Sequence, residues 1–161
     1  MRELDIQMSV NERPVKQRIG VNTLLRDFLR EDLELTGTKG ACDDGMCGSC
    51  SVHLDGEVVK SCLVLAADAN GRSVRTIEGL ADSDDVLHPV QQALLDEFGF
   101  QCGFCTPGMA MTMVYLLESG FQPDQESARE SLVGNICRCT GYDRIADAMI
   151  LAASTMGENN A

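Results

Sequence analysis

The chain has 161 residues, of which 44% are apolar and none is tryptophan, a length that allows one ordinary domain or two small ones. Its formal net charge of −12 argues against nucleic acid as a partner, because an acidic surface repels a phosphate backbone. No basic and apolar leader opens the sequence and no apolar run is long enough to span a bilayer, so we expect a cytoplasmic protein without a membrane span.

The first elements are expected to be a hairpin and a helix. Residues 4–10 alternate apolar and polar side chains, which predicts a half-buried strand, and residues 15–19 continue as a second strand after a short polar turn. Residues 24–31 place apolar side chains at helical spacing, and Asn22 or Thr23 is expected to cap this helix.

A cysteine loop and further strands follow. Residues 36–50 are rich in glycine and show no periodicity, which is typical of a loop. The Asp-Gly pair at 55–56 predicts a tight turn between strands at 51–54 and 58–61. A short strand is expected at 73–77.

The composition changes after residue 80. The acidic stretch 81–85 is expected to link a domain of residues 1–80 to a second domain of residues 86–156, with a disordered tail at 157–161. Four helices are predicted in the second domain, at 88–98, 106–117, 125–133 and 142–154. The expected fold class is therefore α+β, with a small four-helix bundle after a strand-rich half.

All eight cysteines fall into two sets of four. The first set has the plant-ferredoxin spacing for a [2Fe–2S] cluster, in which three thiolates come from one tight loop and the fourth from a later strand. Its members are Cys42, Cys47, Cys50 and Cys62. Gly45 and Gly48 allow the loop to turn its amide N–H groups toward the sulfurs at little steric cost.

The second set consists of two close pairs separated by helical sequence, Cys102 with Cys105 and Cys137 with Cys139. Each pair precedes a predicted helix, and the N-terminus of a helix favours negative charge such as that of an anionic cluster. This half alone is also compatible with a four-cysteine zinc site. The two sets together favour two iron–sulfur clusters.

Other metal sites are less compatible with the pattern. A disulfide scaffold is disfavoured by the expected reducing compartment. A Rieske centre needs two histidine ligands, and we expect His53 on a solvated strand face and His88 at a helix start. Met109, Met111 and Met113 are expected to pack in the helical core, since two of them share a helical face.

Several motifs carry a family resemblance. They are Leu35-Thr-Gly-Thr-Lys39, Cys42-x4-Cys47-Gly-Ser-Cys50-Ser-Val52, Cys62, Gln101-Cys-Gly-Phe-Cys-Thr-Pro-Gly-Met109 and Gly134-Asn-Ile-Cys-Arg-Cys-Thr-Gly-Tyr142. With them, the chain from about residue 4 to 155 resembles the iron–sulfur subunit of the molybdenum hydroxylases, the xanthine dehydrogenase and aldehyde oxidase family.

The resemblance implies a β-grasp, plant-ferredoxin-like domain followed by a four-helix domain, each with one [2Fe–2S] cluster. The partners would be a large molybdopterin subunit and a medium FAD subunit, in a heterotrimer or a dimer of heterotrimers, with molybdopterin as its cytosine dinucleotide. Gln101 and the region of Cys139 would contact the pterin. Electrons would pass from molybdenum through the second cysteine set and then the first to FAD. This chain would supply no catalytic residue and would not determine the substrate.

One position departs from the family pattern. Ala41 directly precedes Cys42, where the family usually has glycine, and a positive φ there would strain the loop by about 1 kcal/mol. A free-standing two-cluster carrier is the alternative function, disfavoured by Gln101 and by a helical site that we expect to be buried. A zinc-structured adaptor is the third hypothesis.

Overall fold

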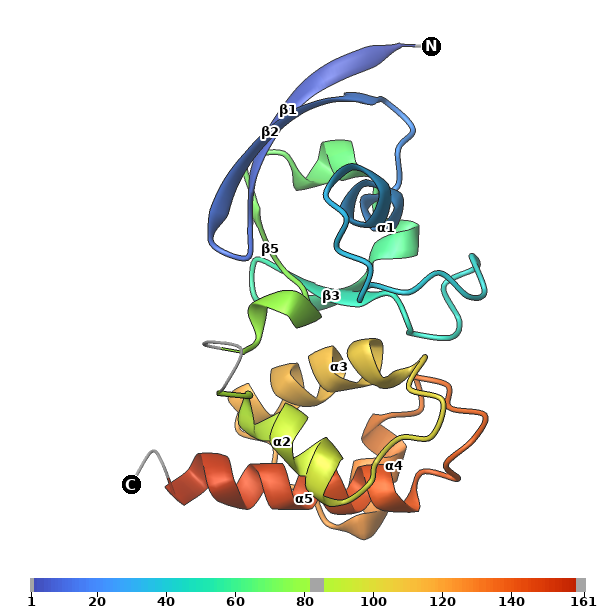
Figure 1. Ribbon diagram of the computed structural model, residues 1–161, viewed down its shortest axis with the longest axis vertical. Coiled ribbons are helices and arrows are strands. Elements are labelled where there is room, and N and C mark those ends of the chain that lie inside the picture. The colour runs from blue at the N-terminus through green and yellow to red at the C-terminus, as the bar shows by residue number, and fades with distance from the viewer. Residues whose placement is uncertain (1, 82–85, 159–161) are drawn as a thin grey trace.

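The computed structural model describes residues 2–81 and 86–158 and confirms an α+β chain, in which a mixed sheet precedes four longer helices (Figure 1). Most of the expected linker, residues 82–85, lies outside the described residues. Among the residues described, none of the helices combines the length and the apolar character that crossing a bilayer requires.

The sheet begins with the predicted hairpin. β1 (Glu3–Val10) pairs antiparallel with β2 (Arg13–Gly20). The turn residues Asn11 and Glu12 have φ of 49° and 64°, the left-handed pair that a two-residue hairpin turn requires. The side chains that β1 buries are those of Ile6, Met8 and Val10, in the predicted alternation.

The predicted second hairpin joins β3 (Ser51–Leu54) to β4 (Glu57–Lys60), with positive φ at both turn residues, Asp55 and Gly56. β5 (Ser73–Arg75) lies between the two hairpins, parallel to β1 and antiparallel to β3. The five strands therefore form one sheet in the order β2-β1-β5-β3-β4.

The helix that crosses the hollow of this sheet is shorter than expected and partly π-helical (Figure 1). α1 spans Leu25–Asp27, and one π-helical turn, η1, spans Phe28–Asp32. The expectation that Asn22 or Thr23 caps the helix is wrong, because the N-cap is Leu24 and no side chain caps this end. The buried side chains of the two segments, which pack on the sheet, are Leu25, Phe28 and Leu29. Three 3-10 helices complete this half: η2 (Ser61–Leu63), η3 (Ala66–Ala69) and η4 (Ile77–Gly79).

The second half contains the four predicted helices: α2 (Pro89–Asp96), α3 (Thr106–Glu118), α4 (Gln125–Ser131) and α5 (Asp143–Glu158). His88 caps α2 and Asp124 caps α4, each through a capping box, so these predicted helix starts are confirmed. α5 continues through Gly157 and Glu158, two residues expected in the disordered tail, and that expectation is wrong for both.

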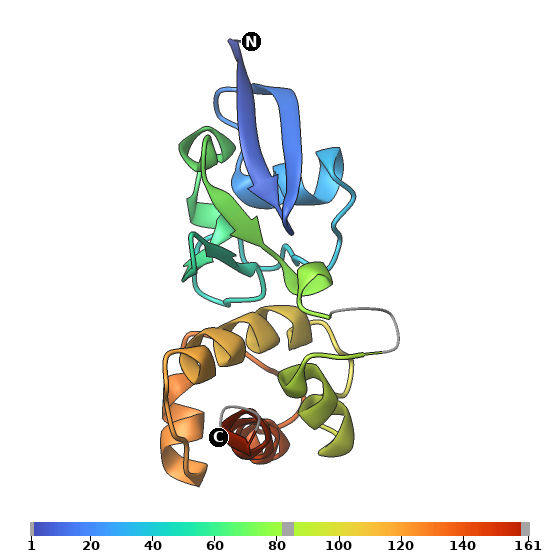
Figure 2. The same ribbon diagram turned by 90° about the vertical axis from the view of Figure 1, so that its left-hand side faces the viewer.

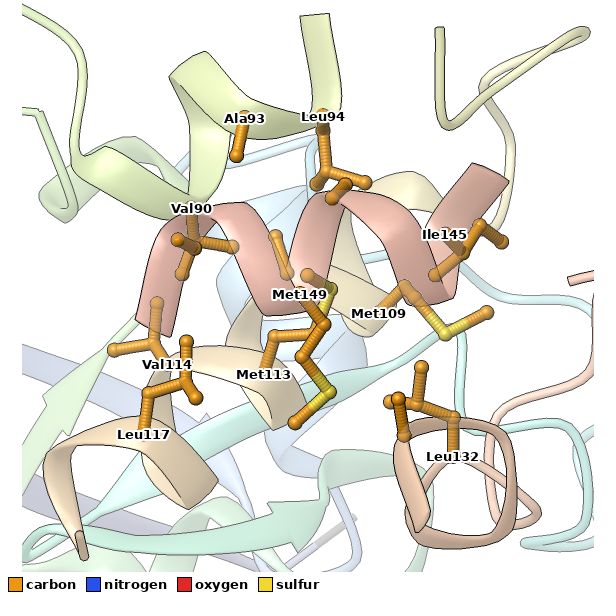
Figure 3. Packing of buried hydrophobic residues seen from close by; sticks show 14 of the residues in the cluster. Val90, Ala93, Leu94, Met109, Met113, Val114, Leu117, Leu132, Ile145 and Met149 are labelled. Carbon is orange, nitrogen blue, oxygen red and sulfur yellow. The ribbon is translucent and has the colours of Figure 1, made fainter. Parts of the chain in front are cut away.

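A second hydrophobic core lies among these helices. Figure 3 shows side chains of α2, α3 and α4 meeting around α5, with Met109, Met113 and Met149 in the middle. All three methionines of the 109–113 series are at most 1% exposed, which confirms that they pack in the core.

His53 joins the two halves. It is 3% exposed, and its Nε2–H donates to the carbonyl oxygen of Met111 on α3 at 2.7 Å. Because a carbonyl oxygen can only accept, Nε2 of His53 carries a proton. The expectation that His53 faces solvent is wrong, because α3 lies against β3 (Figure 2) and the His53 ring is buried in its contact with Met111.

Candidate metal centres

The N-terminal cysteine loop, residues 42–50, leads into β3, and Cys62 follows β4 within η2. The Cys47 N–H donates to Sγ of Cys42 at 3.3 Å. The carbonyl oxygen of Cys50 accepts from both the N–H and the hydroxyl of Ser61, at 3.3 and 2.7 Å. These bonds tie the end of the loop to the residue before Cys62. The structure thus brings the four predicted thiols of the first set together.

Positive φ angles shape this loop at Asp43 (59°), Gly45 (80°) and Gly48 (70°). Ala41 is not in the left-handed region, so it does not strain the loop. At Gly45 a Cβ atom would lie 2.5 Å from Cδ1 of Leu63. The loop therefore needs glycine there for both its backbone angle and the space beside η2.

Two arginines on the α1–η1 segment bond the cysteine loop and the residues just before it. Arg26 bonds Asp27 through Nε at 2.7 Å and also bonds Asp43 in the loop, with a side chain only 13% exposed. Arg30 donates to two backbone carbonyls before the loop, those of Thr36 and Thr38, at 2.9 and 2.8 Å. Sequence reasoning missed both roles, because no local pattern shows which backbone an arginine will reach.

The thiols of the first set differ in acidity. Burial alone would raise the pKa of Cys47, but hydrogen bonds from Ser49 and from Cys42 outweigh it and lower the pKa. Burial, together with the neighbouring thiol of Cys50, raises the pKa of Cys62 to about 11. A bound metal would have to displace the proton of the Cys62 thiol.

The C-terminal set lies before two helices. Cys105 is the N-cap residue of α3, and Cys137 and Cys139 precede α5 across a short turn. The structure brings Cys139 to Cys102, with 3.7 Å between their sulfurs, and the Cys105 thiol to that of Cys137. Each cysteine of the first pair, which precedes α3, therefore contacts a cysteine of the second pair, which precedes α5.

Side chains of the turn support this second site. Thr140 donates to Sγ of Cys137 from its hydroxyl at 3.0 Å and from its N–H at 3.4 Å. The hydroxyl of Tyr142 accepts from the Cys137 N–H at 2.8 Å and donates to the carbonyl oxygen of Asn135 at 3.0 Å. Tyr142 belongs to one of the sequence motifs, but the motif does not reveal these two hydrogen bonds.

Acidity and exposure again differ within the set. Burial would raise the pKa of Cys137, but the bonds from Thr140 lower it, whereas burial and the Cys137 thiol raise the pKa of Cys105 to about 12. Cys102 and Cys139 are exposed. The expectation of a buried helical site is therefore wrong for this chain taken by itself.

The donor set fits two [2Fe–2S] clusters. All eight cysteines are free thiols, and the 3.7 Å between the sulfurs of Cys102 and Cys139 is far from the ~2.05 Å of a disulfide. Across the described ranges 2–81 and 86–158, no three His, Cys, Asp or Glu side chains converge on a single metal-ion position. A [2Fe–2S] cluster does not need such a point, because its two irons share the four thiolates.

The remaining candidate residues are placed as follows. Gln101 is exposed and directly precedes Cys102. Neither histidine offers a Rieske ligand, because His53 is bonded to Met111 and His88 caps α2.

Comparisons with known families agree with this donor set. A family model described as "2Fe-2S iron-sulfur cluster binding domain" matches residues 10–77. A second model, described as "[2Fe-2S] binding domain", matches residues 76–150. Each matched segment holds one of the two cysteine sets in full.

Known proteins resemble the chain over nearly its whole length. Caffeine dehydrogenase subunit gamma of Pseudomonas sp. (strain CBB1) is 47% identical, covering 89% of this chain and 87% of that protein. The nicotine 6-hydroxylase small subunit of Paenarthrobacter nicotinovorans is 43% identical, covering 98% and 94%. The crystal structure of quinoline 2-oxidoreductase from Pseudomonas putida 86 contains a chain that superposes with a TM-score of 0.93 at 37% identity, with full coverage of both chains. The chain therefore belongs to the iron–sulfur subunits of the molybdenum hydroxylase family, which bind two [2Fe–2S] clusters and transfer electrons within multisubunit oxidoreductases.

Proposed function

We propose that the two cysteine sets are the ligands of the two clusters and that they act in series. Cys102, Cys105, Cys137 and Cys139 hold the cluster that receives electrons from the molybdopterin site of a large subunit. Cys42, Cys47, Cys50 and Cys62 hold the cluster that passes them to FAD in a medium subunit. The observation that carries this proposal is the convergence of each set as free thiols supported by amide or hydroxyl donors. When bound, the clusters supply one-electron redox chemistry, and the chain holds and spaces them.

The exposure of two thiols supports the assignment of the C-terminal site to the contact with the large subunit. The exposed thiols of Cys102 and Cys139 need a covering subunit to exclude water, and the exposed Gln101 stands beside them. We therefore assign Gln101 and Cys139 to the contact with the pterin, which we take to be molybdopterin cytosine dinucleotide.

Apolar side chains support docking at both sites. Phe104, Val133 and Ile136 are 46–84% exposed next to the C-terminal thiols. Met46 and Leu63 are each 65% exposed next to the N-terminal thiols. A free-standing carrier has no need of such apolar surface, so these residues favour a heterotrimer, or a dimer of heterotrimers, over that alternative.

The proposal includes a division of the chain into two domains. Residues 1–80 form the ferredoxin-like domain, and residues 86–156 form a four-helix bundle that holds the second cluster. We place the assembled enzyme in the cytoplasm, where the thiols stay reduced until iron is inserted.

The first test is the metal content and the EPR spectrum of the purified chain. About four irons per chain and two distinct reduced [2Fe–2S] signals are expected. Cys139→Ser should remove the C-terminal signal and Cys50→Ser the N-terminal one, so that each variant controls for the other. Zinc in place of iron, without an EPR signal, would return the chain to the adaptor hypothesis.

A second experiment separates the subunit from the free carrier. The tagged chain, expressed with its native partners, should co-purify with flavin and molybdenum subunits. A stable monomer that carries both clusters and retains no partner would refute the subunit assignment and support the carrier.

A further inference from the structure

The two cysteine loops touch each other directly through their backbones. The Ile136 N–H donates to the carbonyl oxygen of Cys47 at 2.8 Å. Ile136 is covalently joined to Cys137, so one hydrogen bond separates a proposed ligand of one cluster from the neighbour of a proposed ligand of the other. In Figure 1 the two loops lie on the same side of the molecule, one above the other.

A buried side chain makes the adjacent contact. Nδ2 of Asn135 donates to the carbonyl oxygen of Gly48 at 3.1 Å, and Asn135 is 4% exposed. Its own backbone is anchored at both polar groups: its N–H donates to Leu132 at the end of α4, and its carbonyl accepts from Tyr142. The amide of Asn135 is therefore fixed from the helical side and reaches across to the N-terminal loop.

Glycines allow the backbones to approach this closely. A Cβ atom at Gly48 would lie 2.4 Å from the carbonyl oxygen of Gly134. A Cβ atom at Gly108, in the first turn of α3, would lie 2.3 Å from the carbonyl oxygen of Gly48. Three segments distant in the sequence thus meet at Gly48 with no room for a side chain.

We propose that Asn135 is a positioning residue that locks the N-terminal cysteine loop onto the C-terminal one and so sets the spacing between the two clusters. The spacing is then a property of this chain and does not depend on the partner subunits. The proposal rests on the ligand assignment under the proposed function. In the transfer that it serves, one electron leaves one cluster and enters the other, and no bond is broken and no proton moves.

The test replaces Asn135 by a residue of similar volume that cannot donate. Asn135→Leu removes the hydrogen bond from the helical half to the Gly48 carbonyl, which keeps only its bonds to Ser51 in its own loop, so the contact between the two loops should loosen. The matched control is Asn22→Leu, an exposed asparagine in a turn outside both cysteine loops. The readouts are the magnetic interaction between the two reduced clusters in the EPR spectrum and the hydrogen exchange of the peptide that contains Ile136.

Asn135→Leu should keep the EPR signals of both clusters but weaken or broaden the splitting between them. Amide exchange in the peptide that contains Ile136 should become faster, and electron transfer between the clusters after rapid reduction should become several-fold slower. The control should match the wild-type chain in all three. Unchanged splitting and exchange in Asn135→Leu would overturn the proposal. If the wild-type chain lacks two clusters, the proposed function fails instead, so the two failures are distinguishable.

A second pair of variants keeps the proposal testable if Asn135→Leu does not fold. Gly108→Ala pushes directly on the Gly48 carbonyl, whereas a Cβ atom at Gly134 would have only Nζ of Lys60 near it, at 4.0 Å. Gly108→Ala should alter the splitting and Gly134→Ala should not. Equal spectra for the two variants would overturn the proposal.

Discussion

The two cysteine sites place four thiols each in contrasting surroundings. At the N-terminal site Cys50 and Cys62 are buried, 3% and 6% exposed. At the C-terminal site Cys102 and Cys139 are exposed at the starts of two helices. The first site is largely completed by its own chain, whereas the second leaves half of its thiols for a partner subunit to cover.

The two sites also differ in what shapes them. The N-terminal loop depends on backbone angles and close packing at glycines, and on the ion pair between Arg26 and Asp43. The C-terminal turn depends on side-chain hydroxyl groups, those of Thr140 and Tyr142. We therefore expect the first site to be sensitive to added volume and the second to lost hydrogen bonds.

The largest expected effect comes from adding a methyl group to the equivalent glycine of each Cys-x2-Cys pair. Gly48 and Gly103 both have positive φ, of 70° and 77°, but only at Gly48 would the added Cβ atom have other atoms within 4 Å. Gly48→Ala combines left-handed strain with a steric clash and should cost about 3 kcal/mol. Gly103→Ala carries the strain alone, about 1 kcal/mol. Thermal unfolding midpoints followed by circular dichroism compare the two, and equal shifts would contradict the difference between the sites.

A smaller effect is expected from Tyr142→Phe. The change removes the acceptor of the Cys137 N–H and the donor to the Asn135 carbonyl, and should cost about 1–2 kcal/mol. Loss of the hydrogen bond from the Cys137 N–H should also shift the reduction potential of the C-terminal cluster. Redox titration with EPR detection measures this potential. The N-terminal cluster should keep its potential.

The matched control for that change is Tyr115→Phe, since the chain has only two tyrosines. Its hydroxyl bonds the exposed carboxylate of Glu57 at 2.8 Å, away from either set of thiols. A shift in cluster potential as large as that of Tyr142→Phe would show that the hydroxyl of Tyr142 has no specific role.

The smallest expected effect concerns pH and the contact between the halves. Burial lowers the pKa of His53 below its usual 6.5, opposed by the bond to Met111 and the charge of Glu118 and reinforced by Arg75. Below pH 6.5 His53 binds a proton in the unfolded chain more readily than in the folded chain. The contribution of neutral His53 to stability is therefore fully present above pH 6.5 and is lost as the pH falls through the pKa of the unfolded state and then that of the folded state.

The comparison for this effect is His53→Gln, whose side-chain amide can still donate to Met111. The wild-type unfolding midpoint should fall relative to that of the variant as the solution is acidified, and the difference should be constant above neutrality. A difference that does not change with pH would show that His53 is not protonated on unfolding.

Much of the local structure could be predicted from the sequence. The alternation in β1, the Asp55-Gly56 turn and the starts of α2 and α4 depend on residues close in the sequence, and each was confirmed. The cysteine spacings likewise indicated two sets of four, because the first has the plant-ferredoxin spacing and the second consists of two close pairs.

The failures concern contacts between distant segments. His53 follows the alternation of an exposed strand position, and only the docking of α3 buries it. The expected cap of α1 was not formed, because tertiary packing outweighs the local preference of Asn22 or Thr23. No local pattern indicated that Asn135 would reach Gly48, since the two are 87 residues apart.

That separation has a consequence for synthesis of the chain. The ribosome releases the loop with Cys42, Cys47 and Cys50 long before Asn135, so the loop lacks its final support until most of the chain has emerged. The contact that closes over the first cysteine set is thus a long-range one, with a high loop-closure cost. Closure over the N-terminal cysteine set therefore requires the C-terminal half of the chain.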